Sequence, residues 1–71
     1  MKKCWYYFTF GWGQQNGGHY VKFYGTYETA RQQMIDRYGL SWGFQYSEDD
    51  WKEWVERAGR IGFPVETELK Q

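Results

Sequence analysis

The sequence contains one cysteine, one proline and one histidine, and it has no long apolar run. A single cysteine, Cys4, excludes an internal disulfide and is typical of a protein in a reducing compartment. No stretch approaches the roughly 18 consecutive apolar residues of a transmembrane helix. Lys2 and Lys3 are not followed by the small-residue cleavage site of a signal peptide. We therefore expect a cytoplasmic protein that makes no membrane contact.

The sequence also lacks the residue groups that most catalytic and metal sites require. His19 is the single histidine, whereas a transition-metal site needs several ligands. Asp49 and Asp50 are adjacent on a predicted helix and point about 100° apart, so they suit the first turn better than a metal dyad. The glycine-rich loop at residues 11–18 has Asn16 where a dinucleotide fingerprint needs glycine, and it lacks a P-loop lysine. These absences predict a protein that is not an enzyme and that holds no metal or cofactor.

The formal net charge is zero, but it is unevenly distributed. Residues 1–26 carry three lysines and no acid, and residues 47–71 carry seven acids against four bases. A nucleic-acid-binding domain normally presents a basic stripe to the phosphates, so nonspecific nucleic-acid binding is not expected. The acidic last third is either a solvated helix face or a surface that meets a basic protein.

Seventeen of the 71 residues are Phe, Tyr or Trp, and they gather in segments that read as strands. The predicted strands are residues 4–10, 20–24 and 42–46, which are rich in aromatic and β-branched residues. Helices are predicted at residues 27–38 and 48–58, with Thr26 and Ser47 as N-caps. The order β-β-α-β-α predicts one α+β domain over residues 1–71, a three-stranded sheet with two helices on one face. The core spans about residues 4–58, the tail at 59–71 packs partly on it, and sheet orders 2-1-3 and 1-2-3 both remain open.

The alternation of strand side chains predicts aromatic residues on both faces of this sheet. The more apolar set is assigned to the core: Cys4, Tyr6, Phe8, Phe10, Val21, Phe23, Trp42, Phe44 and Tyr46. The opposite face then carries Trp5, Tyr7, Thr9, Tyr20, Lys22, Tyr24 and Gln45. Folding needs one apolar face, so a second aromatic face indicates a contact surface. It can stack a planar ligand, form a dimer interface, or be covered by the tail.

Two further residues, Arg31 and Trp12, are candidates for contact with a ligand. Arg31 lies inside the apolar stripe of the first helix, where its head either reaches solvent along an apolar surface or lines a pocket for an anion or a carbonyl-rich ligand. Trp12 lies between two glycines, so its ring could close over a bound molecule. The candidate ligand-binding residues are Trp5, Tyr7, Trp12, Gln14, His19, Arg31 and Gln45.

Three segments resemble small uncharacterised proteins of phages and prophages in Firmicutes. They are F-T-F-G-W-G-Q at 8–14, Y-V-K-F-Y-G-T-Y-E-T-A-R at 20–31 and Y-G-L-S-W-G-F-Q-Y-S at 38–47. The resemblance covers about residues 5 to 58 and carries no known activity, so no residue role is transferred. It implies the cytoplasm of an infected bacterium as the setting. Tiny phage proteins of this sort are often counter-defence factors, which block a CRISPR effector nuclease or sequester a nucleotide-derived immune signal.

Three hypotheses follow for a non-enzymatic binding protein. In the first, the aromatic face and the glycine-rich loop capture a nucleotide-like small molecule. In the second, the acidic second helix inhibits a host defence protein by direct contact, in the manner of an anti-CRISPR protein. In the third, the aromatic face forms a structural homodimer.

Overall fold

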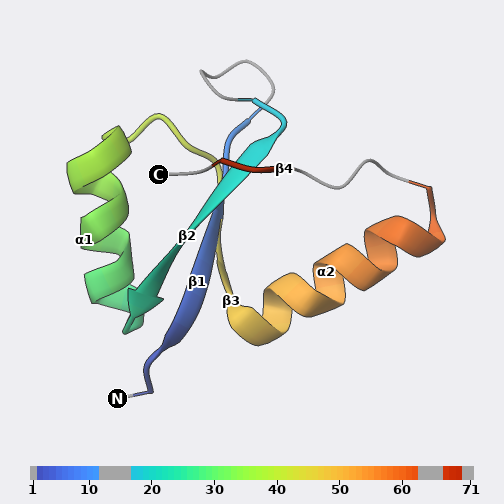
Figure 1. The fold of residues 1–71 in the computed structure, drawn as a ribbon, viewed down its shortest axis with the longest axis horizontal. Helices are drawn as coiled ribbons and strands as arrows, with labels where there is room; N and C mark the ends of the chain where they lie inside the picture. Colours follow the sequence, from blue (N-terminus) through green and yellow to red (C-terminus); the bar gives the residue numbers. More distant parts are fainter. Residues whose placement is uncertain (1, 12–16, 63–66, 70–71) are drawn as a thin grey trace.

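A computed structural model describes residues 2–11, 17–62 and 67–69, and it has an α+β fold (Figure 1). The elements in chain order are β1 Cys4–Thr9, β2 His19–Gly25, α1 Tyr27–Tyr38, β3 Gln45–Ser47, α2 Glu48–Arg60 and β4 Thr67–Glu68. The α+β class and both helices are confirmed. The expected three-stranded sheet is wrong in its strand number, because β4 adds a fourth strand.

The sheet has the order β3-β1-β2-β4. The central β1 pairs antiparallel with both β2 and β3, so the first three strands adopt the 2-1-3 order, one of the two left open. β4 joins β2 in parallel, and the backbone hydrogen bonds at its ends run from Thr67 N to Gly18 O at 3.1 Å and from Leu69 N to Tyr20 O at 2.7 Å. A two-residue strand carries no periodic pattern, which explains why it escaped prediction.

Helix α1 begins and ends where its capping residues predict. Thr26 accepts a hydrogen bond from Thr29 N at 3.2 Å, and Thr29 Oγ1 accepts one from Thr26 N at 2.8 Å, which completes a capping box. Gly39 follows the last turn with a φ of 71° and donates its N–H to Ile35 O. The helix lies on one face of the sheet, hereafter the α1 face, and its Ala30 and Met34 complete a buried core with Phe8, Phe10 and Val21.

Helix α2 packs on the opposite face of the sheet, hereafter the α2 face, so the prediction that both helices share one face is wrong. Its buried Trp51 contacts the rings of Tyr7, Tyr20 and Tyr46, whereas α1 packs over Phe8 and its neighbours. Figure 1 shows the two helices on opposite sides of the strands. The sheet is thus the middle layer of three, and the second aromatic face is partly covered by the protein's own helix.

A β-bulge before β3 explains why Gln45 and Tyr46 lie on the faces opposite to those predicted. Thr9 faces two residues at once, since its carbonyl accepts a hydrogen bond from Gly43 N at 2.6 Å and its N–H donates to Phe44 O at 3.0 Å. The extra residue shifts the alternation by one position. Gln45 therefore lies on the α1 face and Tyr46, paired with Tyr7, on the α2 face, which is the reverse of the predicted orientation.

Candidate functional site

The centre of the α2 face is a cluster of four rings, Tyr7, Tyr20, Tyr46 and Trp51. Trp51 stacks on Tyr7 with 5.1 Å between centroids and 5° between planes, and its centroid lies 4.7 Å from that of Tyr20. Trp51 is buried and the tyrosines are half-buried. Burial raises the pKa of the Tyr7 phenol above its ordinary value of 10.0, and the nearby Glu48 and Glu68 carboxylates raise it further. Because its ring stacks on Trp51, Tyr7 helps to attach α2 to the sheet.

One corner of the α2 face stays open to solvent, and we call it the Trp5 corner: Trp5, Lys22 and Tyr24. Trp5 is 39% exposed and Tyr24 52%, and their rings meet edge to face at 5.5 Å. Lys22 Nζ lies 4.8 Å from the Trp5 ring centroid and 3.7 Å from a Glu68 carboxylate oxygen. This corner is what remains accessible of the predicted aromatic surface on β1 and β2.

Arg31, Gln45 and His19 lie on the other side of the sheet. Arg31 is exposed, and its guanidinium lies 5.0 Å from the Trp42 ring centroid. Its head therefore reaches solvent over an aromatic ring, which was one of the two orientations predicted for it, the other being toward a ligand pocket. Gln45 donates to Tyr27 O at 3.0 Å. Gln45 Oε1 and His19 Nδ1 are buried without a hydrogen-bond partner among the residues that the structure describes.

The predicted ligand site is therefore divided. Trp5 and Tyr7 lie on the α2 face, whereas His19, Arg31 and Gln45 lie on the α1 face, and a small ligand cannot contact both sets through the sheet. Trp12 and Gln14 lie outside the described residues.

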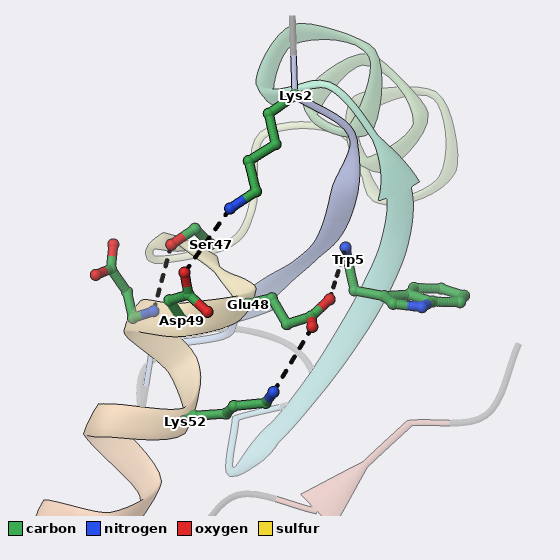
Figure 2. A network of polar contacts seen from close by, with 7 residues as sticks. Lys2, Trp5, Ser47, Glu48, Asp49 and Lys52 are labelled. Atoms are coloured by element: carbon green, nitrogen blue, oxygen red, sulfur yellow. Dashed lines mark hydrogen bonds and ion pairs between the residues drawn. The ribbon is translucent and has the colours of Figure 1, made fainter.

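The acids of α2 are mostly engaged in ion pairs on the helix itself. Glu48, Glu53 and Glu56 pair with the basic residues one turn later, Lys52, Arg57 and Arg60. Asp49 lies 3.9 Å from Lys2. Figure 2 shows Glu48 between Lys52 and Trp5. Its Oε1 accepts a hydrogen bond from the Trp5 backbone N at 3.3 Å. Of the five acids on this helix, Asp50 makes no ion pair with another described residue.

Asp50 contributes to a hollow of about 410 Å³, hereafter the α2 hollow, between one side of α2 and the edge strand β3. Its lining consists of Tyr46, Asp50, Glu53, Trp54 and Arg57. The helical residues recur three or four positions apart and so share one side of α2. Two rings, two carboxylates and one guanidinium meet here, a combination suited to contact with a polar or cationic partner group.

The α2 hollow was not predicted from the sequence. Alternation assigns Tyr46 to the core face, and the helical periodicity of residues 48–58 places Trp54 in one apolar arc with Trp51, Val55 and Ala58, which reads as core. One available signal was Gly43, since an isolated glycine inside a strand pattern often marks a bulge. A bulge at Gly43 turns Tyr46 toward α2 and makes it part of the lining.

Comparison with protein-family models, curated proteins and solved structures found no match to this chain. Within residues 2–11, 17–62 and 67–69, no three His, Cys, Asp or Glu side chains gather as metal ligands would. No helix in the same part of the chain is long and apolar enough to cross a membrane. The assignment of a function therefore depends on the geometry of the surface.

Proposed function

We propose that this chain is a non-enzymatic binding protein that contacts a partner protein through α2 and the α2 hollow. The observation that carries the proposal is the α2 hollow itself, where Tyr46 of β3 and Trp54 of α2 meet beside the carboxylate of Asp50. Tyr, Trp and Arg are the residues that most often dominate binding energy at protein interfaces. A standard interface buries about 800 Å² per partner, so the hollow would be the centre of a contact that extends along α2.

The charge of this region favours a basic partner. Residues 47–71 carry seven acids and four bases, and such an excess steers a positively charged surface into the right orientation. The ion pairs within α2 reduce its field, which leaves Asp50 as the acid with most to gain from a partner. By the resemblance to phage proteins, the partner would be a host defence protein in an infected bacterium, for example a CRISPR effector nuclease.

The test is inhibition of DNA cleavage by a panel of purified CRISPR effector nucleases, together with phage plaque counts on hosts that carry each system. The variant Asp50→Lys/Glu53→Lys should weaken inhibition about tenfold or more, because it places like charges against the partner. The matched control, Glu28→Lys/Asp36→Lys on α1, changes the net charge equally and should leave inhibition intact. Equal loss in both variants would contradict a contact through α2, and so would no loss in either. If the wild-type protein neither inhibits an effector in the panel nor protects phage, the counter-defence proposal fails.

A second candidate function is capture of a nucleotide-like molecule at the Trp5 corner. The exposed indole of Trp5 can stack on a base, and Lys22 beside it can pair with a phosphate. Isothermal titration with a panel of nucleotides and cyclic nucleotides should give saturable heat with the wild-type protein and about tenfold weaker binding with Trp5→Leu. Uniform absence of heat removes this candidate.

A further inference from the structure

We infer that the α2 hollow binds the side chain of an arginine on the partner protein. The inference rests on the proposed contact through α2, and it names the group that enters the hollow.

The charges of the lining favour a cation. Glu53 holds Arg57 at 3.1 Å, so these two residues neutralise each other. Asp50, which makes no ion pair with another described residue, then supplies a negative charge beside two aromatic rings. An anion would meet both carboxylates, and a neutral apolar side chain would strip water from Asp50 without replacing its hydrogen bonds. A cationic side chain satisfies the carboxylate and also gains from the faces of Tyr46 and Trp54.

The rings favour arginine over lysine. A guanidinium is planar and weakly hydrated, so it stacks on an aromatic ring while its edge donates to a carboxylate. The same protein contains an exposed example, since the Arg31 guanidinium lies 5.0 Å from the Trp42 ring centroid. Ligand pockets usually measure roughly 300–1,000 Å³, so the α2 hollow, at about 410 Å³, has room for one extended side chain.

The experiment follows the indole N–H of Trp54 and the ring protons of Tyr46 by NMR during titration with N-acetyl-arginine amide at constant ionic strength. The wild-type protein should show saturable shifts of both groups. The citrulline analogue has nearly the same shape without the charge, and it should produce little shift. The lysine analogue should bind more weakly than the arginine probe.

Variants assign the effect to individual charges. Asp50→Asn should weaken binding about fivefold, the scale of one exposed charge pair. Asp49→Asn is the matched control, because Asp49 pairs with Lys2 outside the hollow, and it should bind as the wild type does. Arg57→Gln removes a competing cation and frees Glu53, so it should strengthen binding, a gain that damage to the fold would not produce.

The inference is overturned if the arginine probe gives no saturable shift, if citrulline binds equally well, or if lysine binds more tightly. It is also overturned if Asp50→Asn leaves the affinity unchanged. Its failure is separable from failure of the proposed function. Loss of inhibition by Asp50→Lys/Glu53→Lys without arginine binding would keep the α2 contact and reject the arginine. Arginine binding by a protein that inhibits no effector would keep the arginine site and reject the proposed inhibition.

Discussion

Gly25 lies at the junction of β2 and α1, where the chain has no room for a side chain. Its φ of 150° is a conformation that L-residues rarely adopt, and a Cβ atom there would lie 2.3 Å from Thr29 Oγ1. Thr29 is held in place by the capping box with Thr26. Glycine is therefore the residue that fits the junction between the end of β2 and the start of α1.

Gly25→Ala should therefore destabilise the fold by about 1–3 kcal/mol, the usual cost of a strained backbone position. Gly59 is the matched control, because it lies within α2, where a Cβ would meet no described residue within 4 Å apart from the neighbouring helix backbone. Gly59→Ala should stabilise the protein by up to about 1 kcal/mol through helix propensity. Urea unfolding of both variants measures the difference, and equal effects would contradict the role given to Gly25.

The tyrosines beneath α2 should titrate late. Burial raises the pKa of Tyr7, and burial with Glu68 and Tyr7 raises that of Tyr20, although Lys22 lowers it. A raised folded-state pKa stabilises the fold below the unfolded value of 10.0, and this contribution is lost as the pH rises through the folded pKa. Ultraviolet titration of tyrosinate should show a late phase in the folded protein that is absent in urea. Tyr7→Phe/Tyr20→Phe should reduce this phase, and superimposable folded and unfolded curves would refute it.

At the scale of elements, helix boundaries were the most predictable part of this protein. The predicted first helix has the bounds of α1, and the second ends two residues before α2, which extends to Arg60. Both begin after an N-cap residue that is visible in the sequence, Thr26 or Ser47. These signals are local, since the residues that satisfy the first turn are the helix's immediate neighbours.

The attachment of α2 to the sheet depends on Trp51. It is 6% exposed and contacts all three tyrosines of the ring cluster. Trp51→Ala should cost about 3–5 kcal/mol of unfolding free energy, a large part of the stability of a small domain. The half-buried Trp54 is the control, and Trp54→Ala should cost less than half as much. Urea unfolding measures both values, and a larger loss from Trp54→Ala would show that α2 is anchored elsewhere.

At the scale of the whole molecule, the chain returns to the sheet through β4, and Leu69 packs against the core of the α1 face. A variant truncated after residue 66 loses the backbone hydrogen bonds of β4 to β2 and this apolar contact, so it should be about 1–3 kcal/mol less stable. Glu68→Gln keeps the backbone pairing and removes only a partly exposed ion pair with Lys22, so it should cost less than about 1 kcal/mol. Equal stability of the truncated and full chains in urea would mean that β4 adds nothing to the fold.

The hypothesis of a homodimer on the aromatic face can also be tested at this scale. Trp51 lies over Tyr7 and Tyr20, so a second copy using the whole face would have to displace α2. The Trp5 corner is too small to supply the roughly 800 Å² per partner of a stable interface. We therefore expect a monomer in sedimentation velocity experiments across a wide concentration range. A concentration-dependent dimer that is lost in Trp5→Leu would favour the homodimer.

The candidate site was predictable only in part. Trp5 and its exposure on the face opposite the main core followed from alternation along a regular strand. The separation of Arg31 and Gln45 from Trp5 did not, and neither did the α2 hollow. The side of Gln45 and the α2 hollow both depend on the bulge at Gly43 and Phe44, which reverses the faces of Gln45 and Tyr46, whereas Arg31 is separated from Trp5 because α1 packs on the Phe8 face.

The sequence by itself determined the α+β class, both helices with their N-caps and the two long strands, because periodicity and capping are interactions between near neighbours in the chain. Only the tertiary structure decided which face of the sheet α2 covers and where an open aromatic surface remains. The orientation of β3 depends on the hydrogen bonds that Thr9 accepts from Gly43 and donates to Phe44, more than thirty positions away. Since one added residue in a strand exchanges its two faces, this distant contact determines which side chains of β3 are turned toward α1 and which toward α2.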